Sequence, residues 1–187
     1  DRQHRDPMLA RVANGDAIVE EDLSGADLSG ADLSGAMFEH VTFVSANLAG
    51  ALLHESIFSD CRFDDATLTG ARLREGTWTT CSFAGADFTN ADVSSATLFR
   101  SNLSRGVLEG ANLTNARIVG SDLCRARLHR ANLEHTTFVD VVTEGLELDG
   151  ARCLRATFME LDLSQALLGK TSFDRAVFLG CDLRGQR

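Results

Sequence analysis

Apolar residues return at every fifth position of the chain, a period that fits neither an α-helix nor a β-strand. Steps of five from Leu23 reach Leu183 without an insertion and touch 33 positions, of which 18 are Leu and ten are Phe. The remaining five positions are Trp78, Val93, Ile118, Thr143 and Cys153. The residue two places before each position is usually small, most often Ala, and rarely Val or Leu. The pattern therefore predicts a five-residue internal repeat through almost the whole chain.

The cleanest copies of the unit read ADLSG, ANLAG and ANLTN, which gives the unit A(D/N)LxG. This pattern resembles the pentapeptide-repeat family and covers roughly residues 18–187. The resemblance implies an all-β solenoid, a right-handed quadrilateral parallel β-helix, in which four units make one 20-residue coil. It also implies that the central residue and the small residue two places before it point inward. At four units per coil, the 33 units would form slightly over eight coils, and at about 4.8 Å between strands these would make a rod roughly 40 Å long.

Residues 20 apart should then lie beside one another on the same side of the rod, and the sequence itself supports this. One series of central positions is aromatic at six of eight places: Phe38, Phe58, Trp78, Leu98, Ile118, Phe138, Phe158 and Phe178. Like side chains in one column favour a close-packed interior. Thr143 is the awkward core position, and we expect larger neighbours to supply its missing volume, namely Val141, Leu146 and Leu161.

The first residues carry helix signals instead of the repeat. Asp6 is expected to cap a helix, Pro7 to be its first residue, and Gly15 to follow its last residue. The residues expected to cover the open edge of the first coil are Met8, Leu9 and Val12. We therefore expect a helical cap over residues 1–17 and a β-helix over residues 18–187. No such cap is expected at the other end, where the rod would continue or meet a partner.

The chain carries few signs of catalytic chemistry. Its Gly residues follow the repeat, so no phosphate-binding loop is present, and an interior filled by Leu and Phe leaves no substrate cavity. No metal-binding spacing connects the five histidines, which are His4, His40, His54, His129 and His135. We predict no enzyme activity, no catalytic residues, no metal and no cofactor.

The five cysteines contain no CxxC pair, which indicates reduced thiols and a cytoplasmic location and not a disulfide framework. A segment of a secreted bacterial protein remains an alternative location. Cys61 and Cys81 fall in one inward column and are expected to be buried fillers. Cys124 is expected to face outward and to be the reactive thiol.

The charge of the chain limits its partners. A net charge of −9 argues against nucleic acid as a direct ligand. Residues 1–93 hold 16 acids and 6 bases, a net −10, whereas residues 94–187 hold 11 acids and 12 bases, a net +1. No run of about 18 apolar residues is present, so no membrane-spanning segment is expected.

Function is therefore expected on the outer faces of the rod. Directly after the aromatic series, five successive coils carry apolar residues that should face solvent: Phe99, Val119, Val139, Met159 and Leu179. The position before the aromatic series adds Met37, Ile57 and Val177. Contiguous exposed apolar patches mark contact surfaces. The first hypothesis is a non-catalytic protein-interaction or scaffold module, which could belong to a larger, secretion-related bacterial protein. Its face would meet a protein partner or a second copy; cover by another segment of the same protein, and a structural spacer, are the alternatives.

A second hypothesis follows from the family resemblance. Some pentapeptide-repeat proteins resemble duplex DNA in width and acidity, bind DNA gyrase or topoisomerase, and confer quinolone resistance. An acidic cluster fits this role and consists of Glu20, Glu21, Asp22, Asp27 and Asp32. Two departures count against it, because the acidity fades along the rod and the C-terminal dimerisation helix typical of those relatives is absent.

Overall fold

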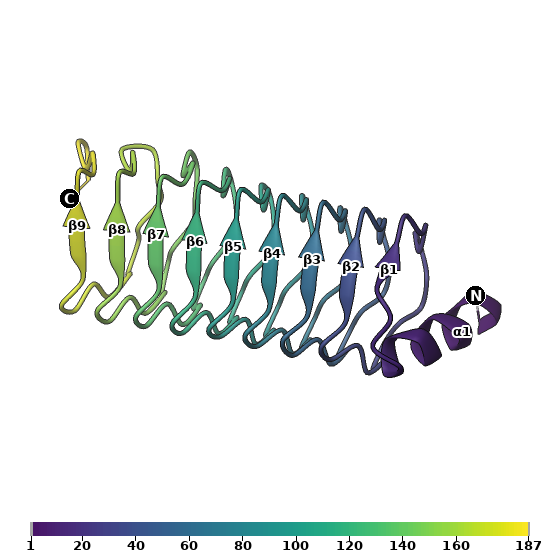
Figure 1. Cartoon of the computed structure of the whole chain (residues 1–187). Helices are drawn as coiled ribbons and strands as arrows, with labels where there is room; N and C mark the ends of the chain where they lie inside the picture. The colour runs from purple at the N-terminus through teal and green to yellow at the C-terminus, as the bar shows by residue number, and fades with distance from the viewer. Residues whose placement is uncertain (1, 187) are drawn as a thin grey trace.

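The computed structural model describes residues 2–186, and the side chains of residues 6–186. Within this part the chain forms a rod of short parallel strands with a helix at its N-terminal end (Figure 1). The elements are α1 (Arg2–Ala13), β1 (Ile18–Val19), β2 (Met37–Glu39), β3 (Ile57–Ser59), β4 (Thr77–Thr79), β5 (Thr97–Phe99), β6 (Arg117–Val119), β7 (Thr137–Val139), β8 (Thr157–Met159) and β9 (Val177–Leu179).

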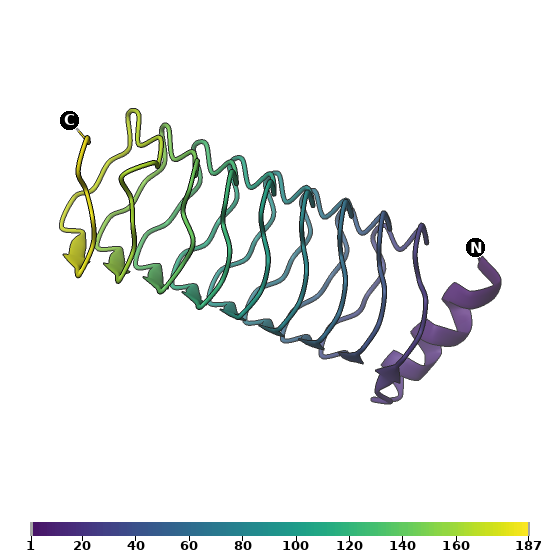
Figure 2. The same ribbon diagram turned by 90° about the horizontal axis from the view of Figure 1, so that it is seen from above.

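The described strands form one parallel sheet in chain order, from β1 to β9. Each strand pairs with the residues 20 positions later, so that Phe38 pairs with Phe58 and Phe58 with Trp78. Between successive strands the chain winds once around the rod, as the view from above shows (Figure 2). The prediction of a parallel β-solenoid of about eight 20-residue coils is confirmed.

The other three sides of each coil are held by one bridge each. In the first coil these bridges join Asp22 to Thr42, Asp27 to Asn47, and Asp32 to Leu52. The sides are therefore five residues long, as the repeat predicts. All backbone pairing runs from one coil to the next, so each coil is stabilised by its neighbours.

The corners explain the Gly at the end of the repeat unit. The N–H of Ala26 donates to the carbonyl of Leu23 at 3.1 Å, and Gly25 between them has a φ of 66°. A positive φ at the third position is typical of a type II turn, which favours Gly. Other residues occupy the same place elsewhere, for example Asp65 with a φ of 56°. The regular ladder thus holds the backbone of these residues in a left-handed conformation that they adopt less readily than Gly.

The Asp or Asn before the central residue accepts a hydrogen bond inside the turn. The Oδ1 atom of Asp22 accepts the backbone N–H of Ser24 at 2.9 Å. The Oδ1 atom of Asn112 accepts the N–H of Thr114 at 3.1 Å. Asp and Asn are favoured at such places because their side chains bind the backbone two residues later. This contact gives the A(D/N)LxG unit a physical reason for its second letter.

Stacked side chains fill the interior of the rod. The rings of Phe43 and Phe63 stack with their centroids 4.5 Å apart, and those of Phe138 and Phe158 with theirs 5.1 Å apart. The inward residues are buried from Leu28 up to Ala166, and those of the last coil are partly exposed. A close-packed interior of this kind has no room for a substrate.

One wide side chain in the core is matched by one missing side chain. Trp78 is 1% exposed, and Gly76 occupies the small position two residues before it. A Cβ atom at Gly76 would lie 3.2 Å from the Trp78 Nε1 atom and 3.1 Å from the carbonyl oxygen of Leu73. The same position holds Ser56 one coil earlier and Ala96 one coil later. The loss of volume at Gly76 therefore makes room for the indole ring.

The N-terminal helix covers the first coil. Met8 and Val12 are 2% and 8% exposed and join the core, while Leu9 is partly buried against it. The N–H groups of Gly15 and Asp16 donate to the carbonyls of Val12 and Arg11, which is a Schellman ending. Gly15, with a φ of 81°, follows the last helical turn as predicted.

The predicted start of this helix is wrong. The helix begins at Arg2, so Asp6 lies inside it and does not cap it, and Pro7 is also inside. The first four N–H groups of a helix have no partner within it. Pro7 lies close to that end and removes only the hydrogen bond to the carbonyl of residue 3, which lets the helix extend past it.

The regular ladder opens near the C-terminal end. Within the described residues, the bridge expected between Val142 and Asp162 is missing, although both pair with their other neighbours. Leu161 lies beside Val141 in a column that holds Cys or Ser in four earlier coils. Two large side chains at adjacent small positions push the two coils apart.

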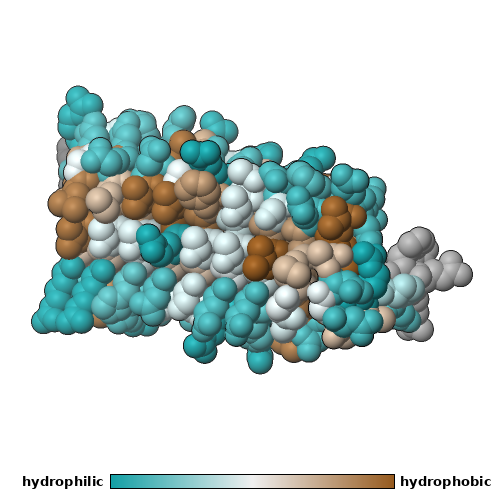
Figure 3. Space-filling view, in the orientation of Figure 1, coloured by the Kyte–Doolittle hydropathy of each residue, from teal (hydrophilic) through white to brown (hydrophobic). Residues whose placement is uncertain are grey.

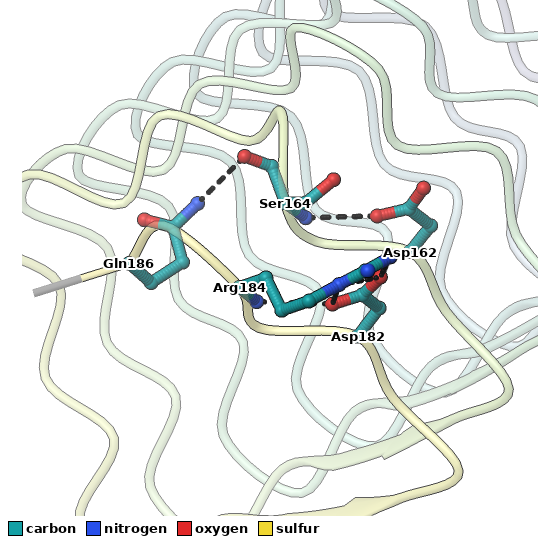
Figure 4. A network of polar contacts seen from close by, with 5 residues as sticks. All are labelled: Asp162, Ser164, Asp182, Arg184 and Gln186. Atoms are coloured by element: carbon teal, nitrogen blue, oxygen red, sulfur yellow. Dashed lines mark hydrogen bonds and ion pairs between the residues drawn. The ribbon is translucent and has the colours of Figure 1, made fainter.

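The last coil is held by polar contacts of the same turn type. The N–H of Ser164 donates to the Oδ1 atom of Asp162 at 2.9 Å, and Asp182 accepts from the backbone and the guanidinium group of Arg184 (Figure 4). The side chain of Gln186 crosses back to the previous coil and donates to the carbonyl of Leu163 at 2.7 Å. These contacts stabilise the end of the rod, where the core residues are partly exposed.

Candidate protein-interaction face

The predicted contact residues lie on one side of the rod, on the outer surface of the sheet. The register pairs Phe99 with Val119, Val119 with Val139, Val139 with Met159, and Met159 with Leu179. Each of these residues follows an inward anchor on its strand, so its side chain points to the opposite, outer face. We call these five residues the apolar strip.

The apolar strip is open to solvent. Phe99 and Leu179 at its two ends are 39% and 49% exposed, and the three residues between them are half-buried. Figure 3 shows a continuous brown row over the strands of the C-terminal half of the sheet. The strip is therefore one contiguous surface and not a set of isolated apolar residues.

The three other predicted contact residues lie on the row that precedes the anchors. Val177 is 45% exposed and sits on β9 together with Leu179 of the apolar strip. Met37 and Ile57 are 43% and 45% exposed, but they lie on β2 and β3, away from the strip. The structure thus places Val177 with the strip and leaves Met37 and Ile57 as a separate pair.

Four exposed large apolar residues were not predicted, of which Leu183, 38% exposed in the last coil, was expected to point inward. Val19 is 42% exposed and belongs to the column of the apolar strip, although Glu39 follows it there. Val142 and Leu167 are 53% and 59% exposed and occupy the place that Asp or Asn holds in the repeat unit. That departure from the unit is the signal that could have identified Val142 and Leu167.

The sheet face is almost free of charge. From β2 to β9, the residues on either side of the anchors include only two charged side chains, Glu39 and Arg117. The other positions hold Thr, Ser and apolar residues. A protein contact on this face would therefore leave few charges without water, and desolvated charges are the expensive ones.

Charged residues lie instead along the edge of the sheet that borders the strip. The guanidinium carbon of Arg100 lies 5.0 Å from the ring centroid of Phe99, a cation–π contact. On the same edge, Asp140 lies two coils after Arg100 and Glu160 lies three coils after it, and both are exposed. The apolar strip thus has a basic residue near one end and acidic residues near the other.

The acidic residues of the second hypothesis do not lie on one side. Asp22, Asp27 and Asp32 make bridges on three different sides of the first coil. Glu21 forms an ion pair with Arg11 of the helix, and Glu20 occupies a corner with a φ of 55°. The cluster therefore surrounds the first coil and is not a single acidic surface.

Within the described side chains, no three His, Cys, Asp or Glu residues are grouped in a way that could hold a metal ion. The Nε2 atom of His129 lies 2.6 Å from the Oε2 atom of Glu147, an ordinary surface pair. The side chain of His4 lies outside the described part.

The described helix is neither long nor apolar enough to cross a membrane.

The opened ladder forms a cleft of about 400 Å³ at the outer surface, beside the apolar strip. Its lining includes four carboxylates, those of Asp140, Glu144, Glu160 and Asp162.

No cysteine of the described part forms a disulfide, and Cys61 and Cys81 are buried, as predicted. Cys124 is half-buried.

The repeat is also found by comparison with known families. A family described as "Pentapeptide repeat region" matches residues 31–108, and "Pentapeptide repeats (8 copies)" matches residues 94–130 and 107–142. The chain belongs to the pentapeptide repeat family. Proteins of this family are in general not catalytic. No curated protein sequence matches this pentapeptide repeat protein.

Solved structures share the fold. One is HetL, a pentapeptide repeat protein involved in heterocyst differentiation regulation from the cyanobacterium Nostoc sp., with 25% identity and a TM-score of 0.63. The match covers 94% of this chain and 91% of HetL. Another is full-length QnrB1, a plasmid-mediated fluoroquinolone resistance protein, with 18% identity, a TM-score of 0.51, and coverage of 87% and 93%. At that identity, the likeness to QnrB1 concerns the fold alone.

Proposed function

We propose that this pentapeptide repeat protein is a non-catalytic interaction module that binds a protein through the outer face of its sheet. The observation that carries the proposal is the apolar strip, which runs over five successive strands of an almost uncharged face. Surfaces of this kind are rare on proteins that bind nothing. The filled interior supports the same conclusion, because it leaves the outer surface as the place for function.

The rod suits this role physically. Backbone hydrogen bonds fix each coil to the next on all four sides, except where the bridge between Val142 and Asp162 is missing, so the strip is presented on a preorganised surface. A partner would therefore bind without the entropic cost of ordering this face. Burial of the remaining exposed part of each apolar side chain would contribute about 1 kcal/mol per residue.

Site-specific photo-crosslinking tests the proposal. A photoreactive phenylalanine analogue replaces Val139 in the middle of the apolar strip, and the protein is irradiated in cells of its natural source. We expect covalent adducts with protein, which mass spectrometry identifies as a second copy or another chain. The matched control carries the analogue at Val107, a half-buried valine on another side of the rod. Equal labelling at both positions, or none at Val139, would refute the proposal.

The DNA-mimic hypothesis has weaker support. The five acidic residues of the first coil surround it and do not form one surface, and the second half of the chain has a net charge of +1, from 12 bases and 11 acids. A mimic of duplex DNA requires a sustained negative field. A supercoiling assay with DNA gyrase would revive this hypothesis if the purified protein inhibited the enzyme.

A further inference from the structure

We propose that the occupant of the apolar strip is a second copy of the same chain, packed face to face with its rod antiparallel to the first. The two-fold axis lies in the interface, crosses the rod, and passes midway between β6 and β7. This inference rests on the proposed function, since it names the partner of the same face. Two features of the face carry it, the position of the apolar residues and the order of charges along both edges of the sheet.

The apolar residues match themselves under this axis. The axis reverses the order of the coils and keeps each outward row opposite the same row of the second copy. Val119 then lies opposite Val139 of the second copy, and Phe99 opposite Met159. Beyond them, Leu179 lies opposite Thr79, at the outer ends of the contact. Both copies therefore bury four strip residues against four strip residues, as an isologous interface requires.

The edge that follows the strands runs from basic to acidic. From the coil of β4 to that of β9 its corner residues are Thr80, Arg100, Gly120, Asp140, Glu160 and Gly180. Under the proposed axis, Arg100 lies opposite Glu160 of the second copy, and this pair occurs twice. Asp140 lies opposite Gly120, which carries no charge. Along this edge, each charged residue therefore faces an opposite charge or an uncharged residue of the antiparallel second copy.

The edge that precedes the strands has the opposite order, from acidic to basic. Its corner residues over the same length are Glu75, Ser95, Asn115, His135, Arg155 and Arg175. The same axis places Glu75 opposite Arg175 of the second copy, again twice. Arg155 meets Ser95, and His135 meets Asn115. One axis thus pairs opposite charges on both edges and places no two like charges directly opposite each other, which favours the contact and fixes its register.

Other arrangements of two copies are less favourable. An axis through Val139 places Asp140 opposite Asp140 of the second copy, which is repulsive. An axis through Val119 pairs Arg100 with Asp140 but places Met159 opposite Thr79 and leaves Leu179 unpaired. Parallel rods place the apolar strip opposite the other outward row, which holds Arg117 and several Thr residues. The axis between β6 and β7 alone combines apolar contact with opposite charges.

The charged groups are available for this contact. Among the described residues, Arg100, Glu160 and Arg175 have no ion-pair partner within the chain, and all three are exposed. Glu75 pairs only with its neighbour Arg74, at 2.9 Å and with 45% of its side chain exposed. Opposite groups on a second copy would therefore form new pairs without breaking a buried one.

The size of the contact predicts a weak dimer. Six coils at about 4.8 Å overlap over roughly 30 Å, and a side of the rod about 15 Å wide gives roughly 450 Å² per copy. The area buried on both copies together, roughly 900 Å², lies at the low end for specific protein complexes. The protein should therefore dimerise in a concentration-dependent way, with a dissociation constant in the micromolar range.

Analytical ultracentrifugation of the purified full chain tests the contact. We expect a monomer–dimer equilibrium in low salt that Val139→Asp abolishes and Val107→Asp leaves unchanged. Arg100→Glu and Glu160→Arg should each raise the dissociation constant at least about tenfold. The double variant Arg100→Glu/Glu160→Arg should recover to within about threefold of wild type, because the pair is restored with its charges exchanged.

Two results would overturn the inference. A wild-type protein that stays monomeric at several hundred micromolar excludes a second copy, while crosslinks from position 139 to a different protein would leave the proposed function intact. A dimer rescued by Arg100→Glu/Asp140→Arg, but not by Arg100→Glu/Glu160→Arg, excludes this register. Circular dichroism of each variant shows that the rod still folds, so a loss of dimer is not a loss of structure.

Discussion

The hydroxyl of Thr143 donates a hydrogen bond to the backbone carbonyl of Asp162 at 2.5 Å. At the equivalent place in most other coils, a backbone N–H makes this contact, as Leu163 does with Asp182 at 2.8 Å. Thr143 is 2% exposed and replaces the Leu or Phe of the repeat. The side chain therefore closes a gap in the ladder that the large pair Val141 and Leu161 opens.

Thr143→Val should lower the free energy of unfolding by about 1 kcal/mol. The change keeps the shape of the side chain and removes the hydroxyl that binds the Asp162 carbonyl. Urea denaturation followed by circular dichroism measures the difference. Thr69→Val, on the surface of another coil, is the control and should change the stability by less than about 0.5 kcal/mol. An equal effect of both variants would show that the hydroxyl has no special role.

Phe138→Ala should lower the free energy of unfolding by about 3–5 kcal/mol. Phe138 is 2% exposed and stacks on Phe158 with their rings within 2° of parallel, so its removal leaves a cavity inside the rod. Phe99→Ala is the matched control, because it makes the same chemical change at an outward residue of β5 that is 39% exposed. In a dilute monomeric sample it should cost far less. Similar losses for both variants would contradict the assignment of inside and outside.

Stability should fall as the pH drops below about 4. Hydrogen bonds from the side chain and then the backbone of Ser34 lower the pKa of Asp32, and bonds from Ser24 lower that of Asp22 in the same way. A carboxyl with a lowered pKa in the folded state contributes stability above its ordinary value of about 3.9, and loses it as the pH falls through the folded value. Urea midpoints measured from pH 7 to pH 2 should therefore decrease in this range.

Variants at Asp32 separate the hydrogen bond from the charge. Asp32→Asn keeps an acceptor for the N–H of Ser34, as Asn112 does for Thr114, so it should stay close to wild type at pH 7 and lose less stability in acid. Asp32→Ala removes the acceptor and should cost about 0.5 kcal/mol at this exposed turn. A loss in Asp32→Asn as large as in Asp32→Ala would show that the charge, and not the turn, matters.

The five thiols should fall into two classes. Burial raises the pKa of Cys153 to about 12, and the hydrogen bond with Cys61, followed by burial, raises the pKa of Cys81. Cys61, Cys81 and Cys153 are all buried, so at pH 8 they should react with iodoacetamide only after unfolding, whereas Cys124 and Cys181, both half-buried, should react in the folded protein. Mass spectrometry of peptides counts the modified sites. Early labelling of Cys153 would contradict a closed core.

The same shift has a consequence at high pH. Because the folded pKa of Cys153 lies above the ordinary value of about 8.5, the protonated thiol contributes stability that is complete below that value and is lost as the pH rises toward 12. Cys153→Ala should therefore remove part of the alkaline loss of stability. An unchanged alkaline profile in this variant would argue against a buried neutral thiol.

The local pattern predicted the fold because each five-residue unit has one structural role. The inward Leu and Phe positions, the small position and the corner Gly all follow from the unit, and the column of Phe38, Phe58 and Trp78 follows from counting by 20. The N-terminus was harder to predict. Asp6 and Pro7 have the residue types of a helix start, but packing of Met8 and Val12 on the first coil stabilises a longer helix.

The apolar strip was predicted as one surface, whereas the positions of the other candidate residues relative to it were not. The sequence indicated that Phe99, Val119, Val139, Met159 and Leu179 point outward, because outward rows are also fixed by the period. It did not show that Val177 adjoins Leu179 on β9 or that Met37 and Ile57 lie away from the strip. It also suggested one acidic cluster, whereas the turns of the coil carry Asp22, Asp27 and Asp32 to three sides.

The sequence by itself determined the coil, the inside and outside of every unit, and the register of the sheet, because a period of five without insertions leaves one way to stack the units. Only the tertiary structure decided where the ladder opens and which charges frame the strip. Those properties depend on side chains 20 residues or more apart, such as Val141 beside Leu161 and Arg100 three coils from Glu160. Side-chain volumes and charges interact between coils, so their combined effect cannot be predicted from one five-residue unit.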